Sequence, residues 1–477
     1  FFDIDKRNKL TLSGYGGRDV LRVVFNNASS NEAGFQMDWG NRTGSLKWTR
    51  VFNPQLFANF WITGSRFTSD FDFGETVPVT ERNLVTDVTL KGNLEYHYSR
   101  HLIGKFGFEQ KNLHLLYRED FPEGGVDVDR RAQHYVAYGQ ANWRPTPRWD
   151  IEAGLRYNNF TSGKSFQNWE PRFSATKYRL SETVNLKAAT GLYYQYLQRI
   201  PRTFFTDIWT SASEYYDPSS ARHYILGFQK EIANDYQLEV ETYYKEYDGV
   251  FAFDPTFLTE IEAGRYNENG DPIFTSANSL FDIGDGDSYG FEMLLRKDVG
   301  AVSGWIGYAF AETEYRFPDV NGGAGFAPRH DRRSTLNLVG NIDIKNTLNA
   351  MQGKPFANHK GNWTLGLNLV YASGQPITAP GSAYITGVAP NSIQRYVEYY
   401  PSAIGNLRLP AYARLDVSLA YLRQYRGWSM SPYLQVFNIG NRKNVWYVDY
   451  KYSNGLSEIE TVNMFPILPT VGINFNF

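Results

Sequence analysis

Hydrophobic and polar residues alternate along most of this chain, and the pattern is clearest at the carboxy-terminus. Val471, Ile473 and Phe475 alternate with glycine and asparagine, and the series ends on the aromatic Phe477. Successive side chains of a strand point to opposite faces of a sheet, so this segment predicts a strand with one apolar and one polar face. Such a strand, ending on an aromatic residue, is typical of the last strand of an outer-membrane β-barrel.

The same alternation recurs from end to end and predicts an all-β chain without a domain linker. The predicted strands number about eighteen, and they lie near residues 9–23, 34–51, 55–68, 82–98, 101–117, 132–145, 148–161, 167–180, 182–196, 220–232, 235–251, 287–298, 302–316, 331–344, 360–373, 410–423, 427–440 and 465–477. Locally this pattern also fits a soluble sandwich or propeller, in which the apolar faces meet in a core.

The connections between the strands separate these alternatives. Tight links, such as 53–55, 99–100, 145–147, 233–234 and 424–426, alternate with long links near 197–219, 252–286, 374–409 and 441–464. The link around 345–361 should be tight in this scheme and is not. Short turns on one rim and long loops on the other are the organisation of outer-membrane barrels, periplasmic and extracellular respectively. We therefore predict a transmembrane antiparallel up-and-down β-barrel over residues 1–477.

Composition agrees with this prediction and excludes several classes of protein. The chain has 477 residues, no cysteine, a formal net charge of -2 and 16% aromatic residues. It contains no run of about 20 apolar residues, which a transmembrane helix requires. The lack of cysteine excludes disulfides, and the near-neutral charge gives no basic surface for nucleic acid. Abundant aromatic residues suit the two interfacial girdles of a barrel.

Several segments, taken in order, resemble the carboxy-terminal barrel of TonB-dependent receptors, the active uptake transporters of the Gram-negative outer membrane. They comprise 170–174, 191–195, 290–295 with 304–305, 331–333, 373–378, 409–416, 436–444 and the terminal strand. No single segment is specific to the family, but the order and spacing of the segments over roughly 300 residues are fairly specific. Residues 1–165 resemble the family only in their general alternating pattern. The family's barrel has about 22 strands and a lumen filled by a plug.

The resemblance implies a transporter of a scarce solute, such as an iron chelate, vitamin, oligosaccharide or peptide. It also implies outer-membrane lipid, the TonB complex acting through the plug, the barrel-assembly machinery that reads the terminal Phe477, and in some members a surface lipoprotein. Because no plug precedes residue 9 and about four strands are lacking relative to the family, we expect the plug and first strands to be absent from this chain. The alternative is a passive porin or specific diffusion channel, complete as given.

Signatures of catalysis and of cofactor binding are missing, so we predict neither an enzyme nor a cofactor. The sequence has no nucleophile elbow, no His-Glu-x-x-His and no phosphate-binding glycine loop. Its seven histidines are scattered without ligand spacing. Asp282, Asp285 and Asp287 lie among glycines in a predicted long loop, where oxygen ligands can hold Ca²⁺. Their spacing departs from a calcium loop, so an ordinary solvated loop is the stronger reading.

The long link at 197–219 combines arginine with aromatic residues and is the candidate ligand gate. Arginine offers a planar fork for carboxylate or phosphate, while Trp and Tyr offer stacking faces. Its candidate residues are Arg199, Arg202, Phe205, Asp207, Trp209, Tyr215 and Tyr216. The competing hypothesis is a loop that uses the same aromatic residues to pack on its neighbours.

A second set of candidates comprises charged residues whose strand phase should turn them into the lumen. A charge on the lipid face costs about 2–4 kcal/mol for Arg or Lys at midplane, so the phase of such residues orients each strand. The set comprises Arg156, Glu239, Glu241, Glu292, Arg296, Arg332, Arg333, Arg414 and Asp416. Arg332 and Arg333 belong to a charged cluster at 329–333 that could equally brace a loop to the barrel.

Overall fold

The computed structural model describes the chain with gaps at connections. The described residues are 2–25, 33–73, 79–121, 124–181, 183–200, 208–233, 235–253, 281–318, 320–357, 359–378, 380–386, 396–401, 403–453 and 456–477.

One antiparallel sheet of nineteen strands forms the body of the molecule. In chain order its strands are β1 (Phe2–Asp5), β2 (Asn8–Phe25), β3 (Ala33–Asn53), β4 (Leu56–Phe73), β5 (Val79–Ser99), β6 (Leu102–Phe121), β7 (Gly124–Trp143), β8 (Trp149–Ser162), β9 (Lys164–Ser181), β10 (Val184–Gln195), β13 (Ser219–Ile232), β14 (Tyr236–Phe253), β15 (Phe281–Lys297), β16 (Val302–Arg316), β17 (Ser334–Asp343), β18 (Gly361–Ala372), β23 (Tyr412–Gln424), β24 (Ser429–Phe437) and β27 (Leu468–Asn476).

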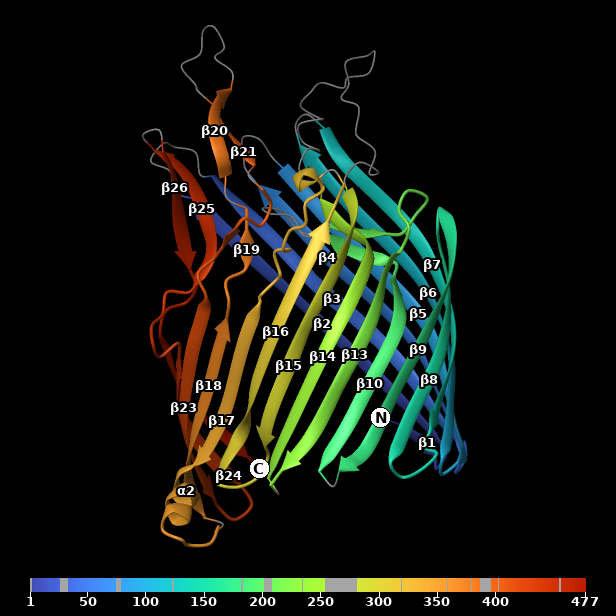
Figure 1. Ribbon diagram of the computed structural model, residues 1–477, viewed down its shortest axis with the longest axis vertical. Coiled ribbons are helices and arrows are strands. Elements are labelled where there is room, and N and C mark those ends of the chain that lie inside the picture. Colours follow the sequence, from blue (N-terminus) through green and yellow to red (C-terminus); the bar gives the residue numbers. More distant parts are fainter. Residues whose placement is uncertain are drawn as a thin grey trace.

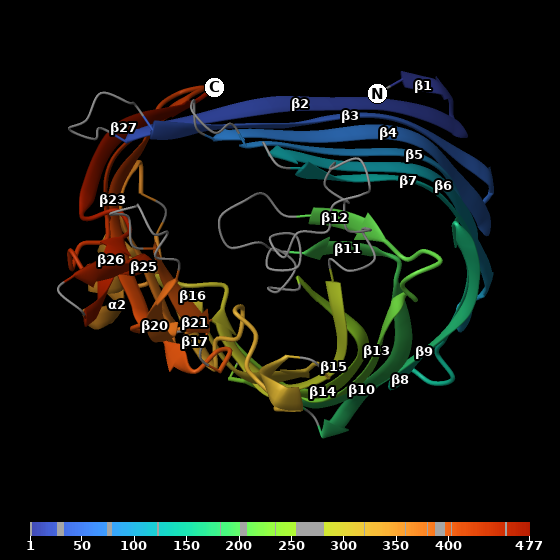
Figure 2. The same cartoon turned by 90° about the horizontal axis from the view of Figure 1, so that it is seen from above.

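Each strand of the sheet pairs with its neighbours in chain order, as an up-and-down barrel requires. Seen from above, the sheet curves into a ring, as Figure 2 shows. Over the described residues, the ladders run continuously from β1 to β27, and no ladder joins these two ends. The transmembrane barrel fold predicted from the alternation is confirmed.

Four two-stranded hairpins lie between strands of the sheet. They are β11 (Leu197–Ile200) with β12 (Ile208–Ser211), β19 (Pro376–Ile377) with β22 (Leu407–Arg408), β20 (Pro380–Thr386) with β21 (Tyr396–Pro401), and β25 (Val445–Ser453) with β26 (Leu456–Asn463). Every one of them belongs to a connection that the sequence predicts to be long. Figure 1 shows β20, β21, β25 and β26 at the upper rim, opposite the rim of short turns.

Every predicted strand has a counterpart in the sheet, and β1 is an additional one. The predicted bounds are least accurate at the long-loop rim, where β7 begins at Gly124 and β15 begins at Phe281. There the ladders continue beyond the alternating segments, because backbone pairing does not require an apolar face. Of the predicted link 252–286, residues 254–280 lie outside the described part of the chain.

The unexpectedly long link near 345–361 contains the helix α2 (Ile344–Met351) at the lower rim, as Figure 1 shows. Asp343 caps this helix by accepting a hydrogen bond of 2.9 Å from the backbone N–H of Asn346. A short 3-10 helix, η2 (Asn321–Gly323), lies in the link between β16 and β17. No helix in the described ranges is both long and apolar enough to cross a membrane.

The outward face of the barrel is apolar and exposed, as the alternating pattern predicts. In β27, Val471 is 78% exposed, Ile473 is 55% exposed and Phe475 is 50% exposed. The corresponding side chains of other strands, such as Leu226 and Ile62, are also exposed. These residues do not pack into a core between two sheets, so the soluble sandwich is excluded.

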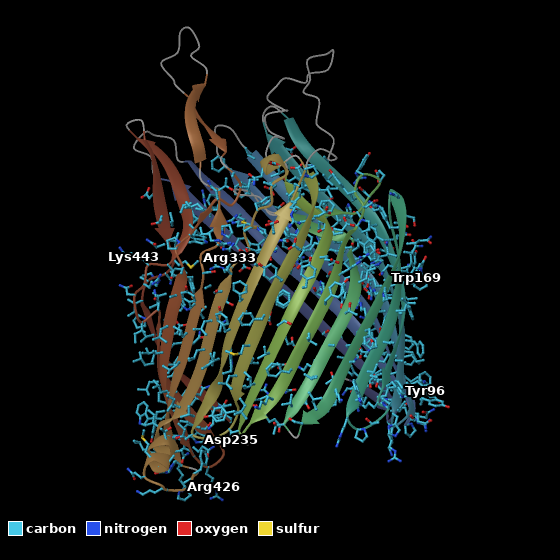
Figure 3. All side chains as sticks on the ribbon, in the orientation of Figure 1. Tyr96, Trp169, Asp235, Arg333, Arg426 and Lys443 are labelled. Atoms are coloured by element: carbon cyan, nitrogen blue, oxygen red, sulfur yellow. The ribbon has the colours of Figure 1, made fainter. Side chains whose placement is uncertain are left out.

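Aromatic residues of the outer wall lie at two levels. Figure 3 shows Tyr96 near the lower rim and Trp169 higher on the same wall. Both side chains are exposed, as expected for residues of the two interfacial girdles. The same view places Asp235 and Arg426 at the lower rim, where the short turns lie.

Candidate functional site: the lumen wall and the hairpin across it

The lumen wall of β5 to β9 carries a row of paired charges. Glu109 is contacted by the Lys111 ammonium at 2.7 Å and by that of Lys91 at 3.9 Å. On the next strands, Glu170 is contacted by Arg172 at 2.5 Å and by Arg156 at 3.9 Å. Both carboxylates are buried. Each therefore has the cationic partners that a buried charge requires.

A second group of charges lines the lumen on β10 and β14. The Lys187 ammonium lies 3.6 Å from Glu241 and also contacts Glu239. Glu292 of β15 lies directly opposite Glu241 in the ladder, on the same face. Lys187 therefore neutralises Glu239 and Glu241 in part, and Glu292 adds a further carboxylate beside Glu241 on the next strand.

The remaining predicted lumen residues other than Arg333 lie at three places. Arg414 and Asp416 of β23 share the inward phase and form an ion pair of 3.1 Å. Arg296 of β15 shares the inward phase of Glu292, and its guanidinium lies 3.1 Å from Asp298 near the lower rim. Arg332 lies in the link that precedes β17 and donates a 3.1 Å hydrogen bond to Gln375.

Arg333 is placed differently from the lumen position predicted for it. Its guanidinium contacts Glu312 at 2.9 Å, and Glu312 accepts a hydrogen bond from the exposed Tyr289. Tyr289 alternates with the inward residues of β15, so this group lies on the outer face of the wall. Figure 3 shows Arg333 in the upper half of the barrel. Arg333 precedes β17, and the alternating pattern of that strand does not extend to it. The sequence therefore could not predict which face of the wall Arg333 occupies.

The charged cluster at 329–333 braces a loop through its buried aspartate. Asp331 is 3% exposed and lies 2.5 Å from the guanidinium of Arg408 in β22. The backbone N–H of Thr313 donates a 3.2 Å hydrogen bond to the same carboxylate. Arg408 also donates to the carbonyl of Gly374 at 3.1 Å. The two partners therefore join the β16–β17 link to the connection between β18 and β23.

The candidate gate at 197–219 forms a hairpin that crosses the interior of the barrel. Figure 2 shows β11 and β12 inside the ring, extending from the side of β10 and β13 toward β5, β6 and β7. β12 contacts these three strands of the opposite wall. In the hairpin, Arg199 pairs with Trp209 and Ile200 pairs with Ile208. The ring of Trp209 lies 6.4 Å from that of Phe67 in β4.

Two buried clusters fix this hairpin to the wall. The first combines Ile200 and Ile208 of the hairpin with Tyr117 and Val128 of the far wall. Tyr216 and Phe281 complete it. The second combines Tyr196 and Ala212 with residues of β6 to β9. In it, the Phe160 ring of β8 is fully buried and stacks on Tyr196 at 4.8 Å.

Two ion pairs attach the segment that follows β12 to strands β7 and β9. Arg130 contacts Glu214 at 3.0 Å, and Lys164 contacts Asp217 at 3.0 Å. A hydrogen bond from its own backbone amide, and then the Arg130 guanidinium, hold the pKa of Glu214 below its usual range. Burial raises the pKa of the Tyr196 and Tyr216 phenols well above their usual range, so both stay neutral.

The predicted gate residues therefore have different environments. Tyr216 is buried, Trp209 is half-buried, and Tyr215 is 50% exposed with the Arg130 guanidinium 5.4 Å from its ring. Arg199 is exposed. Arg202, Phe205 and Asp207 lie outside the described residues. The packing hypothesis explains Tyr216, while Arg199, Trp209 and Tyr215 keep surface that a solute could reach.

The aspartates suggested for calcium lie in a strand instead of a loop. All three belong to β15, where Asp287 contacts Arg316 at 2.9 Å and Asp285 lies opposite Asp248. Throughout the described ranges there is no group of three His, Cys, Asp or Glu side chains that could hold a metal ion. The long ladder between β14 and β15 accounts for the difference, because its upper part lacks the apolar alternation from which strands are predicted.

The sequence analysis missed a cluster of hydrogen bonds that joins β23 to the segment following β24. Asn438 adopts a positive φ of 51°, and its backbone N–H donates a 2.9 Å hydrogen bond to Asp416. The side chain of Asn444 both accepts from and donates to the backbone of Ala413 at 2.9 Å. The Asn-Ile-Gly-Asn run at 438–441 was the available signal, since asparagine favours this left-handed conformation.

Comparison with known proteins identifies a family for this architecture. The family described as "TonB dependent receptor-like, beta-barrel" matches residues 2–439. Among curated protein sequences no match was found.

Solved structures with a similar fold include three ferric-chelate receptors. The ferric yersiniabactin uptake receptor FyuA from Yersinia pestis has a TM-score of 0.64 and 15% identity, over 99% of this chain and 68% of that chain. BauA, the ferric preacinetobactin receptor from Acinetobacter baumannii, has a TM-score of 0.63 and 10% identity, over 99% and 70%. The ferric-catecholate import receptor Fiu from K12 E. coli has a TM-score of 0.60 and 11% identity, over 99% and 78%. At these identities the likeness concerns the fold.

Proposed function

Because the chain belongs to the TonB-dependent receptor family, an outer-membrane family of transport receptors that work with TonB, we propose that it imports a ferric chelate actively. The observation that carries this proposal is the family match across residues 2–439, which includes nearly the whole barrel. The similar structures named above are receptors for ferric chelates, which supports the solute class. The family does not favour the passive porin.

The lumen wall has the chemistry needed to hold a plug. A plug surface that offers arginine or lysine would add cations to the group of Glu239, Glu241 and Glu292, in which Lys187 contacts the first two. The half-exposed cations of the same wall, such as Lys91 and Arg172, would instead donate hydrogen bonds to plug side chains. The expected partner is therefore polar, and a change in these contacts would accompany opening of the lumen.

The docked hairpin supplies the solute contacts of this proposal. Its clusters hold β11 and β12 rigidly, while Arg199, Trp209 and Tyr215 present a cation and aromatic faces. A ferric chelate that carries carboxylate or catecholate oxygens would be recognised by arginine and by aromatic stacking.

The exposed Phe477 is the proposed contact for the barrel-assembly machinery during insertion.

Uptake of ⁵⁵Fe by cells of the source organism tests this function. Cells that carry or lack the gene would be supplied with a panel of ferric chelates, with TonB intact or inactivated. We expect one chelate class to be accumulated only when both the receptor and TonB are present, with surface binding retained when TonB is inactive. Uptake that persists unchanged without TonB would instead identify a passive channel.

The Tyr215→Ala variant tests the hairpin's part in recognition. Loss of an exposed aromatic contact should weaken solute binding with little effect on folding, because this side chain is outside both buried clusters. Tyr236→Ala is a matched control, since Tyr236 is a similarly exposed tyrosine at the start of β14. Equal chelate affinity in both variants and the wild type would remove Tyr215 from the proposed site.

A further inference from the structure

An arginine pair on the outer face of β3 and β4 has no partner among the described residues. Arg42 and Arg66 lie directly opposite each other in the ladder and share the outward phase of the exposed Ile62. Like charges in directly opposite positions of a sheet repel each other. Within the described part of the chain, neither guanidinium forms an ion pair with a carboxylate.

Neighbouring arginines on the same wall are neutralised by aspartates. Arg18 of β2 contacts Asp38, and Arg82 of β5 lies 3.6 Å from Asp70. Arg118 of β6 contacts Asp127 at 2.6 Å. Carboxylates therefore neutralise other arginines on the upper part of this wall, and the Arg42–Arg66 pair lacks this compensation.

The surface around the pair has room for a ligand. It is a depression whose lining includes Gly16, Arg42, Gly44, Gly64 and Arg66. Gly44 and Gly64 lie opposite each other one outward position below the arginines. A Cβ added at Gly16, Gly44 or Gly64 would meet nothing within 4 Å. The surface at these three glycines, beside the two arginines, is therefore open.

The pair lies where the apolar part of the wall ends. Below Arg66, the outward positions of β4 are occupied by Leu56, Ala58, Phe60, Ile62 and Gly64. The stretch from Leu56 to Gly64 is of the length that crosses the hydrocarbon layer, about 9–11 residues. Leu56 follows the short turn, so Arg66 lies on the side of the long loops, at the height of the external lipid headgroups.

We infer that Arg42 and Arg66 bind the phosphate of an anionic lipid in the external leaflet of the outer membrane. Guanidinium groups form paired, charge-assisted hydrogen bonds with phosphate oxygens. A phosphate between the two cations would replace their repulsion with attraction, while the acyl chains of the lipid would lie along the glycines and the apolar residues below. The assignment to a lipid rests on the outward phase of the two arginines and on the exposed apolar Val88 in the lining of the same depression.

Native mass spectrometry of the full-length receptor in mild detergent tests this inference. The probes are a glycolipid with phosphate groups, the same glycolipid after enzymatic removal of its phosphates, and inorganic phosphate. We expect the phosphorylated lipid to bind the wild type, and the Arg42→Gln/Arg66→Gln variant to bind it about tenfold more weakly or worse, through the loss of charge-assisted bonds. Arg18→Gln is the matched control and should bind like the wild type, because Asp38 already neutralises Arg18.

The heat-modifiable mobility of the barrel on gels shows whether each variant is folded. If the double variant fails to fold, the single Arg42→Gln and Arg66→Gln variants are measured in its place, and each is expected to weaken lipid binding. Equal lipid binding by folded variants and wild type would overturn the site. Equal binding of the dephosphorylated lipid would overturn the role of phosphate, and displacement of the lipid by equimolar inorganic phosphate would overturn the assignment to a lipid.

Discussion

Replacement of Phe160 by alanine should release the hairpin from the far wall of the lumen. The Phe160 ring is fully buried, stacks on Tyr196 at 4.8 Å and meets the His134 ring edge-on at 5.6 Å. Truncation of a buried phenylalanine to alanine costs about 3–5 kcal/mol. Since β8 remains held by its ladders to β7 and β9, most of this cost should fall on docking of the hairpin.

Hydrogen exchange of the hairpin amides measures this effect. The backbone N–H of Ala212 donates a 2.8 Å hydrogen bond to the carbonyl of Tyr196, inside the affected cluster. If exchange proceeds through undocking, a loss of about 3 kcal/mol should accelerate exchange of this amide by roughly 100-fold, because each 1.4 kcal/mol is a factor of ten. Amides in the ladders of β7 and β8 should keep their protection.

Leu155→Ala is the matched control for this experiment. Leu155 lies on the same strand, but it is 47% exposed and has the outward phase. Its truncation removes contacts with lipid or detergent and should leave hairpin exchange within about threefold of wild type. Unchanged hairpin exchange in a folded Phe160→Ala variant would refute the reasoning that these clusters hold the hairpin.

Three further perturbations test other parts of the structure. Ile62→Arg places a charge on the lipid face between midplane and the outer interface and should destabilise the barrel by about 1–3 kcal/mol. Thr63→Arg, which faces the lumen, should cost less, and urea unfolding in lipid vesicles compares the two variants. Asp331→Asn should destabilise the loop brace by about 3 kcal/mol, because it leaves the Arg408 charge without its buried partner; normal exchange of the Thr313 amide would contradict this. The pKa of Glu214 is lowered in the folded protein. Its ion pair with Arg130 therefore stabilises the attachment of this segment above the ordinary carboxyl pKa of about 4.3, and this stabilisation is lost as the pH falls through the lowered pKa. A spin label at a cysteine introduced in place of Tyr215, in this cysteine-free chain, should therefore become more mobile only below that range, and a Glu214→Gln background should abolish the transition.

The sequence alone determined which side of each strand faces lipid. Side chains alternate with a period of two, so the phase of apolar residues such as Val471 and Leu155 is a local property that needs no tertiary information. Pairing across the short turns followed as well, because a tight turn forces the two strands that it joins to pair, whereas pairing across the long links is known from the structure. Helix α2 shows the limit of this argument, since link length indicated an unusual turn at 345–361 without its conformation.

How distant segments meet inside the barrel could be learned from the tertiary structure alone. The hairpin at 197–211 reaches β5 to β7 because the sheet curves round and brings Tyr117 and Val128 opposite Ile208. The same residues in a flat sheet would be far apart. The outward position of Arg333 and the isolation of Arg42 and Arg66 likewise depend on which residues the ladders place side by side. The alternation of side chains is a property of the covalent chain, whereas contact across the lumen depends on the curvature of the sheet around it.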